Sequence, residues 1–237
     1  MKENYLNQNM QRRGFLGAIA TATATLGLTS LISPFKLRAE PQKLTSKAAG
    51  PVHQADLWFN QLKGTHRVTF DCTQPHEIFP FAWPKVFLMT NAATGSPETD
   101  CGVVVVLRHS AIPYAFETRL WNDYKFGEMF KADDPKTKVA AIRNPFWKPT
   151  KGDFSIPGIG DVEIGINELQ ASGVMFCVCD TAITVYSAAT AAAMGKDAAE
   201  VKKDWMTGLL PGIMVVPSGV WALGRAQEKG CQYIFAG

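Results

Sequence analysis

Two cysteines stand one residue apart in GVMFCVCDTAIT, which spans residues 173–184. Cys177 lies inside the apolar run, whereas Cys179 ends it and precedes Asp180 and a segment of helical character. The thiolate is the nucleophilic form of cysteine, and a helix N-terminus or a nearby cation favours that form. Cys179 is therefore a candidate nucleophile. Alternation along a strand places Cys177 on the same face, but free cysteine is often a core residue, and we interpret Cys177 mainly in that way.

Two other apolar segments end in groups that could assist a thiol. HRVTFDC ends in Asp71 and Cys72, and GVVVVLRH ends in Arg108 and His109. If these segments are parallel strands, their carboxyl ends share the edge of the sheet at which α/β proteins bind ligands. With a strand order of 2-1-3-4-5, the first three strands are neighbours. We then expect His109 and Arg108 to supply positive charge beside Cys179.

Redox and metal chemistry are alternative uses of the same residues. Cys72 and Cys177 are candidate redox partners of Cys179, and a Cys72–Cys179 disulfide across adjacent strands is geometrically feasible. Together with His109, these thiols are also soft ligands for copper or zinc. However, the chain has no Cys-x-x-Cys pair, no glycine-rich phosphate loop after its first strand and no Gly-x-Ser-x-Gly elbow. The sequence thus predicts no metal and no cofactor.

The hydrophobic patterns alternate between strands and helices along the chain. Strands are predicted at residues 66–72, 102–109, 174–179, 213–216 and 231–235, and helices at 77–91, 111–130, 162–172, 181–194, 197–208 and 219–229. Ser218 occupies the N-cap position of the last helix. This order predicts an α/β fold, a flavodoxin-like three-layer sandwich with a mainly parallel five-stranded sheet. Residues 40–63 are expected to form a flexible lead-in, and residues 131–160 a long loop.

The first 39 residues have the layout of an export signal. Arg12 and Arg13 are followed by Gly14, Phe15 and Leu16 and then by a weakly apolar stretch, which is typical of a twin-arginine signal peptide. We therefore expect the twin-arginine export machinery as a partner and the periplasm as the destination. An oxidising periplasm would permit disulfides.

The charge balance argues against nucleic acid as a partner. Residues 1–39 hold five of the 24 basic residues and one of the 21 acidic residues, so the remaining chain carries nineteen and twenty. No basic stripe remains, which argues against nucleic-acid binding. No later segment is long and apolar enough for a stable membrane span in the mature form.

Residues 64–130 and 160–237 resemble the DsrE/DsrF-like family. The resemblance rests on HRVTFDC, GVVVVLRH, GVMFCVCDTA, LLPGIMVVPSGVWALGRAQEKG and CQYIFAG. It implies a DsrE-like domain at residues 64–237, with the loop around Arg143-Asn144-Pro145-Phe146 as an insertion, and a homo-oligomer. It also implies that Cys179 accepts sulfur as a persulfide from a donor protein or a small sulfur compound. A non-enzymatic binding or assembly protein, using the same crevice or the loop around Phe146 and Trp147, remains an alternative, as does a thiol-redox or metal-binding protein.

Overall fold

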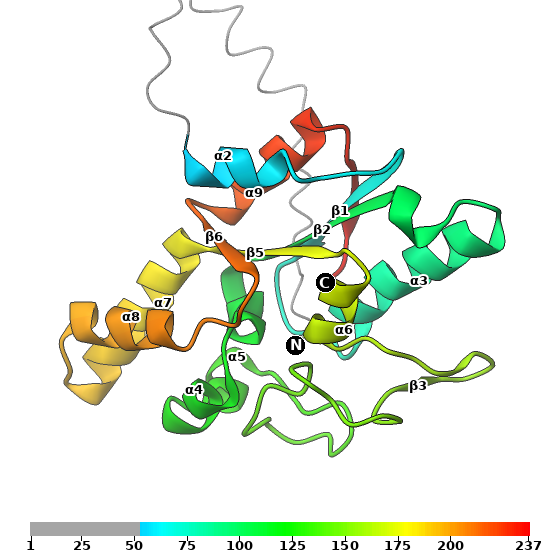
Figure 1. Cartoon of the computed structure of the whole chain (residues 1–237). Coiled ribbons are helices and arrows are strands. Elements are labelled where there is room, and N and C mark those ends of the chain that lie inside the picture. Colours follow the sequence, from blue (N-terminus) through cyan, green and yellow to red (C-terminus); the bar gives the residue numbers. More distant parts are fainter. Residues whose placement is uncertain (1–52) are drawn as a thin grey trace, which may run out of the picture. The chain divides into compact units, whose positions relative to one another are not determined.

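The computed structural model describes residues 53–237 of the chain (Figure 1). The predicted signal at residues 1–39, with Arg12, Arg13, Phe15 and Leu16, and residues 40–52 of the predicted lead-in lie outside this part. The rest of the lead-in is not the flexible segment that we predicted. It contains helix α2 (Gln54–Phe59), because Ala55, Trp58 and Phe59 pack into the core. None of the described helices is long and apolar enough to span a bilayer.

The main sheet has five strands, and all neighbouring strands are parallel. They are β1 (His66–Cys72), β2 (Cys101–Leu107), β5 (Met175–Cys179), β6 (Ile213–Val216) and β7 (Gln232–Phe235). The predicted α/β class is therefore confirmed. The expected order 2-1-3-4-5 is wrong, because the strands lie in the order β6-β5-β2-β1-β7. The chain adds its first four strands in one direction and then returns to pair β7 with the free side of β1.

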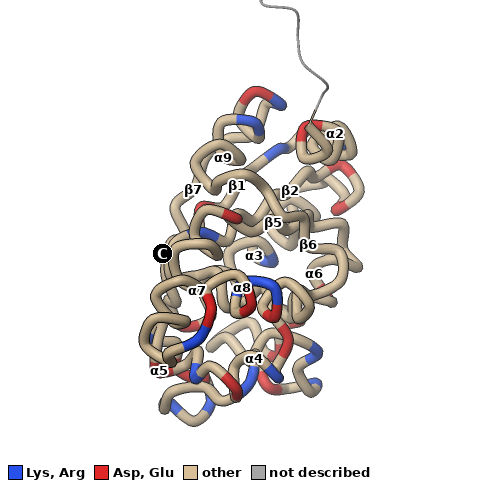
Figure 2. The backbone as a smooth tube through the Cα atoms, turned by 90° about the vertical axis from the view of Figure 1, so that its left-hand side faces the viewer, with Lys and Arg blue, Asp and Glu red and all other residues tan. Residues whose placement is uncertain are grey.

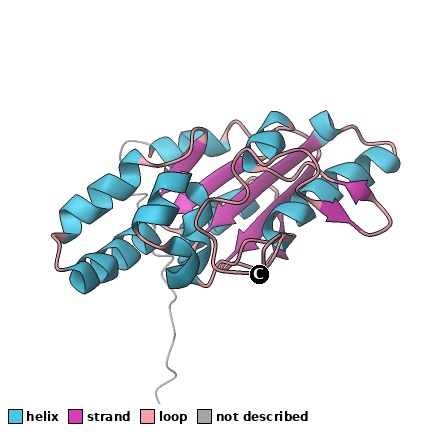
Figure 3. Cartoon of the chain, turned by 90° about the horizontal axis from the view of Figure 1, so that it is seen from below, coloured by secondary structure: helices cyan, strands magenta, loops and turns pink. Residues whose placement is uncertain are grey.

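Helices cover both faces of the sheet, which makes a three-layer sandwich. Strand β2 shows the two faces by strict alternation, with Val103, Val105 and Leu107 in one hydrophobic cluster and Val104 and Val106 in the other. Helices α2 and α9 (Gly219–Glu228) cover the second face and lie above the strands in Figure 1. Figure 3 shows the strands side by side with helices along both sides. A parallel sheet that is buried on both faces explains the continuous valine run.

The helices on the first face are α3 (Phe79–Ala93), α4 (Thr118–Asp123), α5 (Phe126–Phe130), α6 (Ile166–Ala171), α7 (Asp180–Met194) and α8 (Ala198–Thr207). Of these, α3, α7 and α8 agree with the predicted helices to within two residues, whereas α6 is shorter than predicted and the segment at residues 111–130 is broken. The single helix predicted at residues 111–130 is wrong. A 3-10 helix, η2 (His109–Ala115), containing Pro113, precedes α4, and Lys125 at φ 51° separates α4 from α5. These breaks let the aromatic side chains of the segment enter the core from several directions.

The insertion at residues 131–160 is tied to the core by one asparagine. The Asn144 amide donates hydrogen bonds to the carbonyl oxygens of Tyr114 (2.9 Å) and Phe116 (2.8 Å), and its oxygen accepts one from the Phe146 backbone N–H (3.1 Å). Phe146 is fully buried and stacks on Phe81. The insertion also forms a small antiparallel hairpin of β3 (Ser155–Ile156) and β4 (Gly160–Asp161). Phe146 is therefore not available as the partner-binding aromatic residue that the sequence suggested.

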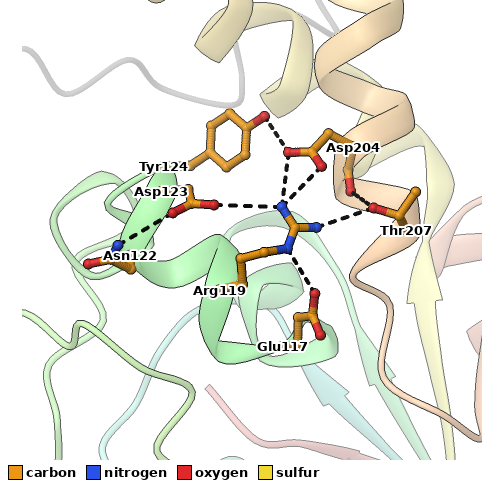
Figure 4. A network of polar contacts seen from close by, with 7 residues as sticks. All are labelled: Glu117, Arg119, Asn122, Asp123, Tyr124, Asp204 and Thr207. Atoms are coloured by element: carbon orange, nitrogen blue, oxygen red, sulfur yellow. Dashed lines mark hydrogen bonds and ion pairs between the residues drawn. The ribbon is translucent and has the colours of Figure 1, made fainter.

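Charged residues are interspersed over the described part of the chain, as Figure 2 shows. A polar network joins α4 to α8 through Arg119 (Figure 4). The Arg119 guanidinium donates to Glu117 (3.0 Å) and Asp204 (3.0 Å), and the Tyr124 hydroxyl donates to Asp204 (2.7 Å). Burial raises the pKa of Asp204, but the hydrogen bonds from Tyr124 and Arg119 outweigh it and hold that pKa below its ordinary value. Burial and the bond to Asp204 raise the pKa of Tyr124 to about 12.

Replacing Asp204 by Asn should destabilise the protein at neutral pH and have little effect in acid. The carboxylate has a lower pKa in the folded state, so its contribution is complete above the unfolded pKa of about 4 and disappears as pH falls through the folded value. Because the Asp204 side chain is 39% exposed, we expect a loss of at most about 1 kcal/mol. Urea unfolding at neutral pH and near pH 3 measures it, with the exposed Asp161→Asn as control. An equal loss at both pH values would contradict this account.

Candidate functional site

The strand order places a ligand crevice between β5 and β6. Helix α7, which follows β5, packs against the face that carries Phe176 and Val178. Helix α9, which follows β6, packs against the opposite face through Ala222 and Ala226. Neighbouring strands whose following helices leave to opposite faces open a gap at their carboxyl ends, and open α/β sheets bind ligands there. The fold therefore points to β5 and β6, not to the edge beside β1.

A pocket of about 400 Å³ occupies this crevice. It is lined by Arg108, His109, Cys179, Thr181, Ala182, Val185, Tyr186, Ser218, Gly219 and Val220. The structure thus brings Cys179, Arg108 and His109 together on one pocket. A larger hollow of about 720 Å³ lies at the opposite edge of the sheet beside Cys101. Burial, followed by Asp100 and Glu98, raises the pKa of the Cys101 thiol, which makes that hollow a poor place for thiolate chemistry.

Cys179 is both the last residue of β5 and the N-cap of α7. Its Sγ accepts a hydrogen bond from the backbone N–H of Ala182 at 3.3 Å, and the residue is 6% exposed. The free amides at a helix N-terminus favour negative charge on a group in this position. The neighbouring Asp180 pairs with Lys202 at 2.8 Å, so a cation offsets its charge. The geometry therefore provides a thiol that caps the N-terminus of a helix and borders the pocket.

The other predicted cysteines are inert by position. Cys177 is fully buried with Val104 and Val106, and burial raises the pKa of its thiol. Cys179 contributes to the opposite cluster, because the chain turns into α7 at this residue, so the expected shared face for the two cysteines is wrong. Cys72 is fully buried, and burial and Asp71 raise its pKa.

No disulfide links these thiols. All five cysteines of the chain are free, and β2 separates the strand of Cys72 from that of Cys179. Burial raises the pKa of the remaining core cysteine, Cys231, to about 11. Within residues 53–237, no three His, Cys, Asp or Glu side chains are grouped so that they could hold a metal ion.

Arg108 is held by a buried carboxylate that the sequence did not identify as part of the site. Its Nε and Nη2 donate to the two oxygens of Asp71 at 2.6 and 2.9 Å, and the Tyr233 hydroxyl donates to Asp71 at 2.8 Å. Asp71 is only 1% exposed, and a buried charge requires such partners. The one signal in the sequence is an aspartate beside the carboxyl end of a predicted strand. The pairing itself depended on the strand order.

His109 stands at the mouth of the pocket in an unusual backbone conformation. Its φ is 49°, in the left-handed region that non-glycine residues seldom adopt. Its ring lies edge-on to Tyr186, with Nε2 3.3 Å from the tyrosine hydroxyl, and its Nδ1 lies 3.2 Å from the Ser110 hydroxyl. These contacts fix an exposed imidazole beside the opening. Strain of this kind often marks functional positions.

Gly219 allows α9 to begin directly against Arg108. A Cβ at this position would lie 2.5 Å from the Cβ and 2.7 Å from the Cδ of Arg108. Ser218 caps the same helix as predicted, its hydroxyl oxygen accepting from the Trp221 backbone N–H at 3.2 Å. The N-termini of α7 and α9 therefore both border the pocket.

Comparisons with known proteins add little to this geometry. No protein-family model matches the chain, and no curated protein matches it significantly. Among solved structures, the chain is similar to a protein of unknown function, MTH1491, from Methanobacterium thermoautotrophicum, with 20% sequence identity and a TM-score of 0.37. The match covers 72% of this chain and 99% of that protein. A likeness of this size assigns no function.

Two glycine-to-alanine substitutions in α9 should have opposite effects on stability. Gly219→Ala should lower the free energy of unfolding by about 1–3 kcal/mol, because the new Cβ overpacks against the rigid part of the Arg108 side chain. Gly224→Ala, where a Cβ meets no atom within 4 Å, should raise it by about 0.5–1 kcal/mol. Urea denaturation of both variants measures the difference. Equal stabilisation by both would show that Arg108 is not packed against the start of α9.

Proposed function

We propose that the protein carries sulfur as a persulfide on Cys179. The observation that carries the proposal is the position of Cys179 at the carboxyl end of β5, on the pocket wall shared with Arg108. It is also the cysteine that caps a helix and lines the pocket, whereas Cys72, Cys177 and Cys231 do not line it. The resemblance of this segment to the DsrE/DsrF-like family supports the same residue.

The proposed transfer moves one sulfur atom and needs no external oxidant. The Cys179 thiolate attacks the outer sulfur of a donor persulfide, R–S–S–H, and a new S–S bond forms at Cys179. The S–S bond of the donor breaks, and the donor leaves as a thiolate that takes up a proton. The N-terminal amides of α7 stabilise the negative charge on Cys179 before the attack, and on its persulfide afterwards. Arg108 adds positive charge at the pocket, and His109 lies at its mouth. Transfer to an acceptor thiol is the reverse reaction.

A binding protein that uses the same crevice is the second candidate function. Val185 and Val220 line the pocket and are 60% and 66% exposed, which is unusual for valines beside a polar site. They would contact a bound partner whether or not sulfur is transferred. A thiol-redox function has less support, because Cys177 and Cys72 are buried away from the opening and all five cysteines are free.

Persulfide loading should depend on Cys179 alone. Treatment with a persulfide donor should add the mass of one sulfur atom to the wild-type protein and none to Cys179→Ser, and reductant should remove it. Serine can cap α7 in place of the thiol, so this variant should retain the fold. Cys101→Ser removes the half-buried cysteine at the other edge of the sheet and should load like the wild type. Intact-mass spectra measure the adduct.

A wild-type protein that gains no sulfur, or a Cys179→Ser variant that still gains it, would refute the carrier function. The same spectra also test the proposed export. Protein recovered from the periplasm should lack residues 1–39, whereas a full-length mass confined to the cytoplasm would overturn that part of the proposal.

We also propose that the chain forms a homo-oligomer through β7. This strand is a sheet edge, all four of its residues are exposed, and Ile234 and Phe235 are 40% and 58% exposed. An apolar edge strand pairs readily with another strand unless a charge blocks it. The second copy would extend the sheet across this edge.

Phe235→Lys should convert the oligomer into a monomer, because a lysine on an edge strand opposes strand pairing. Ile142→Lys, at a residue of the insertion that is 75% exposed, should leave the assembly unchanged. Light scattering during gel filtration gives the mass of each variant. A monomeric wild type, or an oligomer that survives Phe235→Lys, would remove β7 as the interface.

A further inference from the structure

Arg108 presents one unused edge of its guanidinium. Asp71 occupies Nε and Nη2, and Nη1 makes no hydrogen bond to any residue in the described part of the chain. The side-on pairing leaves the end-on edge, formed by Nη1 and the second hydrogen of Nη2, free to bind a carboxylate with two hydrogen bonds. The Arg108 side chain is 28% exposed and lines the pocket.

Arg108 and Cys179 both line the 400 Å³ pocket. The hydrogen bond with Asp71 outweighs burial and raises the pKa of Arg108, so the guanidinium stays charged. The lining contains no Asp, Glu or Lys, and Arg108 is its permanent charge. A ligand that reaches Cys179 therefore meets Arg108, whose other edge is paired with Asp71, and no acidic side chain in the pocket lining.

The rest of the pocket suits an organic body. Ala182, Val185 and Val220 supply apolar surface, and Tyr186 adds an aromatic ring. At about 30 Å³ for each water-sized group, the pocket has room for roughly a dozen such groups. Hydrogen sulfide or a short inorganic polysulfide would leave most of this apolar surface in contact with water. A molecule of amino-acid size would cover it.

We infer that the sulfur donor of Cys179 is a small organic persulfide that carries a carboxylate, with the carboxylate on Arg108 and the apolar body against Val185 and Val220. The inference rests on the proposed carrier function and specifies its substrate class. The outer sulfur of the donor meets the Cys179 thiolate, the donor S–S bond breaks, and the donor leaves as its thiol. Asp71 and Tyr233 act as positioning residues, because they fix the plane of the guanidinium.

The test compares two donors that differ only in one charge, the persulfide of N-acetylcysteine and that of N-acetylcysteine amide. Wild-type protein should load Cys179 from the carboxylate donor roughly ten- to hundredfold more efficiently, as a charged hydrogen-bonded pair implies. Arg108→Lys keeps a cation beside Asp71 but loses the fork, so the preference should fall to a few-fold. Arg225→Lys, at a salt-bridged arginine of α9 that does not line the pocket, should keep it.

The outcomes distinguish the inference of a carboxylate donor from the carrier function on which it rests. Equal loading of wild-type Cys179 from both donors would overturn the carboxylate inference and leave the carrier function standing, as would loading from inorganic polysulfide or a protein persulfide only. No loading from any donor would overturn the carrier function itself. The wild-type comparison needs no variant, so it decides even if Arg108→Lys does not fold. A preference that Arg108→Lys retains in full would also overturn the role of Arg108.

Discussion

The buried Asp71 carboxylate is the constraint on which the carboxyl end of the sheet depends. At 1% exposure it cannot remain ionised without partners, and leaving such a charge uncompensated would cost about 3–5 kcal/mol. Its partners come from the two strands that flank β1, since Arg108 follows β2 and Tyr233 belongs to β7. The aliphatic part of Arg108 in turn sets where α9 begins, because it occupies the space beside Gly219. One ion pair thus connects the middle of the sheet to the crevice between β5 and β6.

The topology turns this local constraint into a site. Because the chain builds β1, β2, β5 and β6 in one direction, the helices that follow the first three strands lie on one face, and α9, which follows β6, lies on the other face beside α2. The single change of face falls between β5 and β6. Cys179 ends the first of these strands and Ser218 follows the second, so each caps a helix whose N-terminus borders the opening. The pocket therefore follows from strand order rather than from any one loop.

The sequence predicts the elements of this fold better than their arrangement. The run Gly102–Leu107 identifies a strand that is buried on both faces, and Ser218 identifies a helix start, because each signal is local. Strand order is not local. Both faces of each central strand are apolar, so the hydrophobic pattern does not show whether β5 pairs with β1 or with β2.

That missing order explains why Cys72 was expected at the crevice and Asp71 was not. The break-up of residues 111–130 was hidden for a related reason, since aromatic residues at helical spacing look alike whether they line one helix or enter a core from three short ones. Helix α2 was missed because its polar surroundings concealed three residues that bury against the second face of the sheet.

A sulfur carrier must accept a labile atom and then protect it, and the surroundings of Cys179 suit both requirements. Thiols destroy persulfides by attacking them, so nearby reactive cysteines would shorten the life of the carried sulfur. Here Cys177 lies in the same strand as Cys179 but faces the opposite core. Burial raises the pKa of its thiol, as it does for Cys72. Cys179 itself is 6% exposed, which limits attack to what the pocket admits. A pocket with one oriented cation would then select the donor by its anionic group while excluding bulky reductants. In the proposed carrier, the same burial that makes two cysteines inert would give the third its selectivity.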